Sequence, residues 1–299
     1  MNTFFKVLEE KRILVGDGAM GTTLFESGLN IGDCPEYLNI TKPDIVQRIA
    51  LGYIAAGSDL IQTNSFGASP LKLAEYGLQD KTENINREAV RLIKSINKDI
   101  LISGSIGPTG KIMAPLGDVD PEEIFDGFLL QSYALIDGGV DVICIETMSD
   151  IHELALAVKA VKAHSSHIPI IATMTFDETP HGFFTVMGNS IPDVVSTLEN
   201  IGVDILGSNC GNGLQKMIEI ANQFISASTH PIIIQSNAGL PELINNNLRF
   251  PETPDFFQKH IPELLISGVS IIGGCCGTTP EYIRRIRTVV DNFIELKYS

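Results

Sequence analysis

The sequence is poor in positive charge and contains no basic run. Its 299 residues include 21 Lys and Arg against 36 Asp and Glu, which gives a formal net charge of −15. Nucleic-acid phosphates are bound by clustered Lys and Arg side chains. The composition therefore argues against a nucleic-acid partner.

Long hydrophobic runs are also missing. No apolar run approaches the roughly 18 residues of a membrane-spanning helix. The first residues, MNTFFKVLEEKR, form a mixed-charge amphipathic stretch, without the apolar core of a signal peptide. We therefore expect a cytoplasmic protein that does not associate with membranes.

Cysteine is scarce, with five residues in the whole chain. An odd number in a long chain does not fit a disulfide framework. In a reducing compartment these cysteines are expected to be core thiols, metal ligands or nucleophiles.

No Pro-, Gly- or Ser-rich linker divides the chain, so we expect one domain over residues 1–299. A weak internal repeat is visible instead, in which a Gly precedes a small polar or acidic residue and an apolar run. Each Gly is expected to end a helix and each run to form a buried strand. The four copies are Gly57-Ser-Asp-Leu-Ile-Gln, Gly139-Val-Asp-Val-Ile-Cys, Gly202-Val-Asp-Ile-Leu-Gly and Gly268-Val-Ser-Ile-Ile-Gly.

Eight apolar runs are expected to form strands, and they begin near residues 13, 59, 100, 141, 169, 203, 232 and 269. Helical patterns separate them, with N-terminal capping signals at Asp120-Pro, Asp150-Ile, Thr253-Pro and Thr279-Pro. Regular alternation of apolar strands with helices predicts a parallel sheet. Eight units in a chain of this length predict a closed (β/α)8 TIM barrel.

Three cysteines follow the ends of predicted strands, where such barrels carry their active sites. Cys210 follows the sixth strand, and Cys275 and Cys276 follow the eighth, its second neighbour in the barrel. Zinc suits converging thiolates, and three protein ligands leave a position open, as in catalytic zinc sites. The alternative is that Cys275 and Cys276 are core thiols or a redox pair. Cys34 and Cys144 are assigned no role.

Polar side chains follow other predicted strands. Asp17 is either a ligand-binding carboxylate or a helix cap, and Glu146 either binds a substrate ammonium or forms a structural salt bridge. Asn64, Asn209 and Asn237 also follow strands, where Asn often serves only as a turn residue.

The turn Gly16-Asp-Gly-Ala-Met-Gly fits the pattern G-x-G-x-x-G, which opens dinucleotide-binding folds. Such folds place an acidic ribose ligand about 20 residues further on. Here that stretch is a proline-containing loop, and the second predicted strand ends in Gln62-Thr-Asn without an acid. An NAD(P)-dependent oxidoreductase using Gly16–Gly21 stays as an alternative.

Seven segments together carry a resemblance to a known family, and they run in order from residue 16 to residue 280. They are Gly16-Asp-Gly-Ala-Met-Gly-Thr, Gln62-Thr-Asn-Ser-Phe-Gly-Ala, Gly104-Ser-Ile-Gly-Pro-Thr-Gly, Glu146-Thr-Met-Ser-Asp, Ser208-Asn-Cys-Gly-Asn-Gly, Asn237-Ala-Gly-Leu-Pro and Gly273-Gly-Cys-Cys-Gly-Thr-Thr-Pro. The sequence resembles the homocysteine S-methyltransferase family. It is most similar to the homocysteine-binding barrel of cobalamin-dependent methionine synthase.

The resemblance implies specific roles for the residues at these positions. It places Zn2+ on Cys210, Cys275 and Cys276 and the homocysteine amino group on Asp17 and Glu146. It assigns the substrate carboxylate to the backbone N–H groups of the turn at Ala19 and Met20. It also implies that Asn237 supplies a fourth zinc ligand when substrate is absent.

Two departures from the family bear on the methyl donor. The full methionine synthase carries folate, cobalamin and activation modules that 299 residues have no room for, so methylcobalamin is expected on a separate corrinoid protein. Gly67 stands where betaine-using relatives carry a Tyr, and Gly277 where S-methylmethionine users carry an Arg. Both positions favour the corrinoid donor over the small donors S-methylmethionine and betaine. A barrel that binds a thiol without catalysis is a further alternative.

Overall fold

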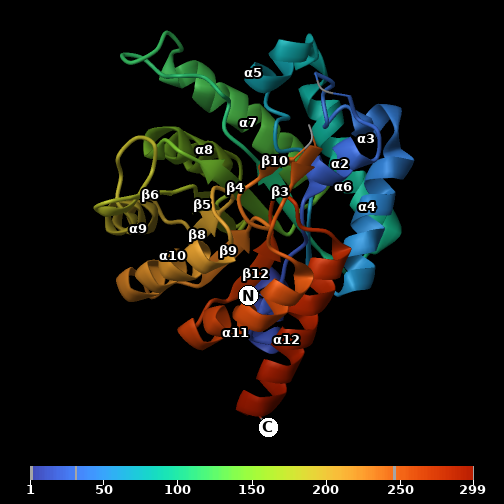
Figure 1. Cartoon of the computed structure of the whole chain (residues 1–299). Coiled ribbons are helices and arrows are strands. Elements are labelled where there is room, and N and C mark those ends of the chain that lie inside the picture. Colours follow the sequence, from blue (N-terminus) through green and yellow to red (C-terminus); the bar gives the residue numbers. More distant parts are fainter. Residues whose placement is uncertain (1–2, 31, 245–246, 299) are drawn as a thin grey trace.

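Eight parallel strands form a closed barrel surrounded by helices in the computed structural model (Figure 1), which describes residues 3–30, 32–244 and 247–298. The strands are hydrogen-bonded in the order β1-β12-β9-β8-β5-β4-β3-β2. They are β1 (Leu14–Val15), β2 (Leu60–Gln62), β3 (Leu101–Ile106), β4 (Val142–Met148), β5 (Ile170–Met174), β8 (Ile205–Asn209), β9 (Ile232–Ser236) and β12 (Ile271–Gly274). The N–H of Asp59 donates to Val15 O (2.7 Å) and joins β2 to β1. The predicted (β/α)8 barrel is confirmed.

The main outer helices alternate with the strands along the chain. They are α4 (Pro43–Ala56), α6 (Thr82–Ile96), α7 (Pro121–Gly138), α8 (Ile151–His164), α9 (Ile191–Asn200), α10 (Leu214–Ala227), α11 (Pro254–Ser267) and α12 (Pro280–Tyr298). Asp120, Asp150 and Thr253 cap α7, α8 and α11 by accepting hydrogen bonds from N–H groups of the first turn. Within the described ranges, no helix is long and apolar enough to cross a membrane.

Shorter helices and two hairpins lie at the two ends of the barrel. Helix α1 (Thr3–Lys11) precedes β1, and α2 (Met20–Glu26) follows it; α3 (Leu38–Thr41) and α5 (Pro70–Leu73) lie on either side of β2 in the chain. Two small hairpins, β6–β7 (Asp177–Thr179 and Gly182–Phe184) and β10–β11 (Glu242–Ile244 and Asn247–Arg249), extend loops that follow β5 and β9. The apolar pattern did not predict these hairpins, because Phe183 is the one buried residue among their described side chains.

The sequence repeat has a structural counterpart at the starts of β2, β4 and β8. In each of these repeats the Asp carboxylate accepts a hydrogen bond from the main-chain N–H of a neighbouring strand, at 2.8–2.9 Å. The pairs are Asp59 with Val15, Asp141 with Ile102 and Asp204 with Ile170. The repeated acid therefore fixes the register between neighbouring strands.

The barrel interior changes character along its axis. Its N-terminal half is an aliphatic cluster closed by α1, and Cys144 packs within it. The members of this cluster include Phe4, Leu8, Leu14, Leu60, Leu101, Val142, Ile171, Ile205, Ile233 and Ile271. Because strand side chains alternate, the next interior positions are small or polar, among them Gln62, Ser103, Gln235 and Gly273. A polar pocket therefore opens at the C-terminal end.

Candidate active site

Three cysteines converge at the C-terminal end of the barrel. The Sγ atoms of Cys210, Cys275 and Cys276 all lie within 4.8 Å of one another, and those of Cys210 and Cys276 are 3.9 Å apart. Strand β9 holds both loops, because the N–H of Cys210 donates to Gln235 O and the N–H of Cys275 donates to Ser236 O. The structure thus brings the three predicted cysteines together.

The electrostatics of the cluster favour a bound cation. Hydrogen bonds from the thiols of Cys275 and Cys276 lower the pKa of Cys210 to about 3. The Cys210 sulfur in turn raises the pKa of Cys276 to about 11 and that of Cys275 well above its usual value. Three thiolates require a positive ion among them.

The donor set fits zinc. Zn–S bonds of about 2.3 Å in a tetrahedron separate neighbouring sulfurs by about 3.8 Å, close to the observed 3.9 Å between Cys210 and Cys276. Asn237 supplies a second indication, because its side-chain amide donates to Cys210 and its Oδ1 is buried without a partner among the described residues. Rotation of this amide would exchange its nitrogen for its oxygen beside Cys210, which suits a fourth metal ligand.

Cys34 and Cys144 lie outside this cluster. The Cys34 thiol is buried beside Glu36, to whose Oε2 it donates at 3.4 Å. Cys144 is fully enclosed in the aliphatic half of the barrel. Burial raises the pKa of both thiols, so neither is a ready nucleophile.

Glu146, near the end of β4, is a buried carboxylate at the pocket. Its Oε1 accepts from Gln62 Nε2 (3.0 Å) and from the Ser105 hydroxyl, and its Oε2 accepts from Asn209 Nδ2 (3.3 Å). Burial raises its pKa to about 7. Within the described ranges no salt bridge joins it to a basic side chain.

Asp17 lies next to Glu146 and is only 2% exposed. Its Oδ2 accepts from the N–H of Gln62 at 2.9 Å, whereas its Oδ1 is buried with no hydrogen-bond partner in the described part of the chain. Burial, together with the nearby charge of Glu146, raises the pKa of Asp17 to about 7. A cationic ligand would stabilise both carboxylates in their charged form.

Asn209, the last residue of β8, connects the carboxylates to the cysteines. Its Oδ1 accepts from the Thr147 N–H and the Thr173 hydroxyl, at 2.9 and 2.7 Å. Its Nδ2 donates to Thr147 Oγ1 (2.7 Å) and Glu146 Oε2 (3.3 Å) and lies 4.0 Å from Cys275 Sγ. From the sequence, Asn209 could be either a site residue or an ordinary turn residue. Its interior position on β8 is the signal that could have distinguished these two roles.

The glycine turn packs against the loop that carries the paired cysteines. The Ala19 N–H donates to the carbonyl and hydroxyl of Thr278, both at 3.3 Å, and the Tyr53 hydroxyl donates to Ala19 O. A Cβ at Gly18 would lie 2.8 Å from both Thr278 Oγ1 and the Tyr53 ring. The glycine is therefore explained by packing, without a dinucleotide. Met20 begins α2, whose first-turn N–H groups have no acceptor within the helix.

A pocket of about 270 Å³ opens beside these groups. Its lining combines the three cysteines with the turn after β1 and polar residues from β2, β4 and β9. The residues that bear on the chemistry are Ala19, Met20, Gln62, Glu146, Gln235 and the three cysteines. Asp17 and Asn237 do not belong to this lining, but each is hydrogen-bonded to a residue that does, Asp17 to Gln62 and Asn237 to Cys210.

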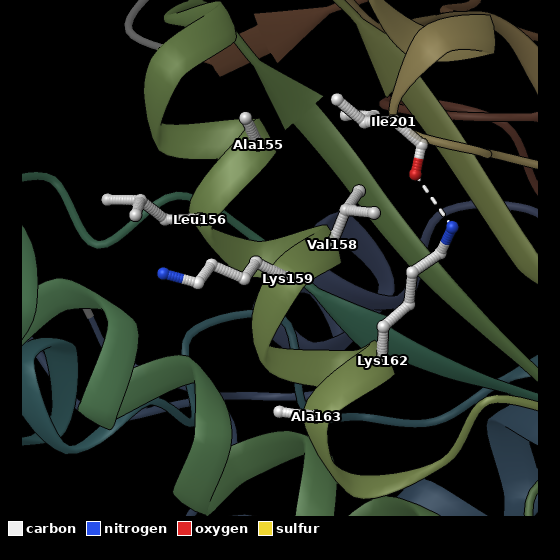
Figure 2. Close-up of a pocket in the computed structure, with 7 residues that line it drawn as sticks. All are labelled: Ala155, Leu156, Val158, Lys159, Lys162, Ala163 and Ile201. Carbon is white, nitrogen blue, oxygen red and sulfur yellow. Dashed lines mark hydrogen bonds between the residues drawn. The ribbon is translucent and has the colours of Figure 1, made fainter.

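A larger cavity, of about 630 Å³, is lined by the outer helix α8 (Figure 2). Its lining residues are Ala155, Leu156, Val158, Lys159, Lys162, Ala163 and Ile201. Lys162 Nζ donates to Ile201 O at 2.6 Å. This lining offers neither a thiol nor a carboxylate, so the smaller pocket is the candidate active site.

Comparison with known proteins identifies the family. Residues 14–290 match the family model described as homocysteine S-methyltransferase. The chain belongs to the homocysteine S-methyltransferase family. The methionine synthases of Mycobacterium leprae (strain TN) and Mycobacterium tuberculosis (strain ATCC 25618 / H37Rv) are each 31% identical to it, over 298 and 300 residues. These matches cover 94% of this chain but 24% and 25% of the two synthases, so the chain spans about a quarter of their length.

A solved structure of this family's fold agrees with the barrel. The metallated form of the homocysteine methyltransferase MmuM from Escherichia coli superposes with a TM-score of 0.79 at 23% identity. The match covers 95% of this chain and 98% of that one. The two chains thus share the barrel fold over almost their whole length.

Proposed function

We propose that this chain transfers a methyl group to the thiol of homocysteine and forms methionine, with a zinc ion held by Cys210, Cys275 and Cys276. The observation that carries the proposal is the convergence of three sulfurs within 4.8 Å in a pocket shared with a buried carboxylate. Membership of the family and similarity to proteins named methionine synthase support it.

The ion would supply a Lewis acid for the substrate thiol, which the chain's side chains do not. A zinc ion held by Cys210, Cys275 and Cys276 would leave a position for the substrate sulfur and would lower the pKa of that thiol, which at pH 7 is otherwise mostly protonated. Asn237, whose Oδ1 is buried without a partner among the described residues, would be the fourth residue to hold the ion when substrate is absent.

The chain's own residues would select and orient the amino acid. Asp17 and Glu146 would accept the ammonium group, which relieves the cost of two neighbouring buried carboxylates. The N–H groups in the first turn of α2, beginning at Met20, would receive the substrate carboxylate. The N–H of Ala19 already donates to Thr278, so Ala19 would help by shaping this turn.

The reaction is a substitution at the methyl carbon. The substrate thiol releases its proton to solvent, its sulfur forms the new C–S bond, and the donor's bond to the methyl group breaks with the electron pair staying on the donor. The residues that orient the substrate sulfur therefore carry the catalysis, and no side chain has to act as a general base.

We propose a methylcorrinoid, carried by another protein or module, as the donor. The space that a side chain at Gly67 would take is occupied by Glu36, whose Oε1 accepts from the Gly67 N–H at 2.7 Å. An aromatic residue for a quaternary ammonium donor would fit there only with a displacement of the Glu36 side chain. Gly277 has φ +79° and its Cβ position lies 2.2 Å from the Phe250 ring, so an Arg is excluded.

Methionine formation from homocysteine with three donors tests the proposal. The zinc-loaded protein is incubated anaerobically with homocysteine and methylcobalamin, S-methylmethionine or betaine, and methionine is quantified. We expect methionine with methylcobalamin and little with the other two. Methionine from S-methylmethionine or betaine alone would overturn the donor, and no methionine from any donor, with homocysteine still bound, would favour a non-catalytic thiol-binding barrel.

A further inference from the structure

Gln235 in β9 has a buried side-chain amide that nothing in the mechanism above uses. The residue is 3% exposed and lines the same pocket as the cysteines and Glu146. Its Oε1 is buried and has no hydrogen-bond partner in the described part of the chain. An unmatched buried acceptor is destabilising, so the position of Gln235 on the pocket wall indicates that its amide oxygen accepts a hydrogen bond from a ligand.

The Gln235 side chain and the main chain of Asp17 approach each other closely at Gly273. On the adjacent strand, Gly273 pairs with Gln235 in the β9–β12 ladder. A Cβ at Gly273 would lie 3.2 Å from Gln235 Cγ and 3.1 Å from the main-chain oxygen of Asp17. The missing side chain at Gly273 therefore lets Gln235 approach Asp17 across β12.

A second acceptor without a partner among the described residues is Asp17 Oδ1. Gln62 links Asp17 to Glu146, because its N–H donates to Asp17 Oδ2 and its Nε2 donates to Glu146 Oε1. Three acceptor groups, from β9, the end of β1 and β4, thus belong to different strands around the interior of the barrel. A single small cation with several N–H donors, bound between these strands, would satisfy them together.

We propose that Gln235 is a specificity-determining residue whose amide oxygen accepts one N–H of the substrate ammonium, beside Asp17 and Glu146. This inference rests on the proposed function. A primary ammonium has three N–H donors, and an amide completes the set without adding a third buried negative charge. Asp17 and Glu146 repel the substrate carboxylate, which therefore lies away from them, toward α2.

The test removes the amide from the protein and the ammonium from the ligand in turn. Binding to the zinc-loaded protein is measured by isothermal titration calorimetry with homocysteine and with 4-sulfanylbutanoate, which is homocysteine without its amino group. Gln235→Leu keeps the side-chain size and loses the amide. Gln215→Leu, the same change on the exposed face of α10, is the matched control.

We expect Gln235→Leu to weaken homocysteine binding about tenfold, or about 1.4 kcal/mol, and to leave 4-sulfanylbutanoate binding unchanged. Equal binding of homocysteine by the wild type and Gln235→Leu would overturn the inference. An equal loss for both ligands would also overturn it, since it would assign Gln235 a structural role.

Two further results separate folding and function from this inference. If Gln235→Leu does not fold or retain zinc, Gln235→Met, which also lacks the amide, is measured in its place. If the wild type fails to bind homocysteine at all, the proposed function fails and the inference falls with it. If the wild type binds homocysteine and Gln235→Leu binds it equally well, only the proposed role of Gln235 is rejected.

Discussion

Asn209 and Glu146 are joined side chain to side chain, with Asn209 Nδ2 3.3 Å from Glu146 Oε2. The same nitrogen lies 4.0 Å from Cys275 Sγ, so one amide touches both the carboxylate side and the sulfur side of the pocket. Asn209 is 1% exposed and its Oδ1 is held by Thr147 and Thr173. In the proposed function, Asn209 would therefore fix the spacing between the carboxylate that receives the substrate's amino group and the cysteines.

Removing this amide should affect stability and binding together. We expect Asn209→Ala to lower the free energy of unfolding by about 2–4 kcal/mol, because several buried partners lose their hydrogen bonds. Homocysteine affinity should fall about tenfold. Urea unfolding and calorimetry measure the two effects. Asn222→Ala, on the exposed face of α10, is the control. An Asn209→Ala variant as stable as that control would contradict the role of Asn209.

The pKa of Asp17 predicts a pH dependence of stability. Because its pKa rises from 3.8 to about 7 on folding, the folded protein keeps a proton that the unfolded chain releases above about pH 4. Its contribution to the free energy of unfolding is therefore full below that pH, falls as the pH rises to about 7, and is constant above. The difference corresponds to at most about 4 kcal/mol.

Asp17→Asn should remove this dependence. The variant is expected to be more stable than the wild type at pH 8, to lose that advantage as the pH falls toward 4, and to bind homocysteine more weakly. Urea unfolding of the zinc-loaded proteins between pH 5 and 8.5 measures the slope, with exposed Asp177→Asn as the control. Parallel slopes for wild type and Asp17→Asn would mean that Asp17 is not buried and unpaired in solution.

The repeated Asp residues at the starts of β2, β4 and β8 should stabilise the barrel without affecting the proposed reaction. Asp204→Ala leaves the N–H of Ile170 without its 2.9 Å acceptor. We expect a loss of about 1–3 kcal/mol in the free energy of unfolding, with zinc content unchanged. Asp177→Ala should be nearly neutral. Loss of zinc in Asp204→Ala would show that the register of β5 and β8 is coupled to the cysteines.

Much of the fold could be predicted because its signals are local. The repeat Gly139-Val-Asp, for instance, combines a helix end, a strand start and the acid that fixes register in three residues. The capping residues Asp120 and Asp150 likewise marked α7 and α8. The two small hairpins carry no buried apolar pattern, so nothing local distinguished them from loops.

The site was predicted unevenly for a physical reason. Cys210, Cys275 and Cys276 are rare residues at strand ends, and their type alone suggests a metal. Gln62 and Gln235 are common polar residues within short strands. Only the closed barrel shows that both point inward and that Gln235 approaches Asp17 across Gly273.

Zinc content tests the central claim most directly. Protein purified with reductant and without oxygen should contain about one zinc per chain by elemental analysis. Cys276→Ser should lose it, and Cys34→Ser, a cysteine outside the cluster, should keep it. No zinc in the wild type, and none taken up on reconstitution, would contradict the three-thiolate site and the methyl transfer built on it.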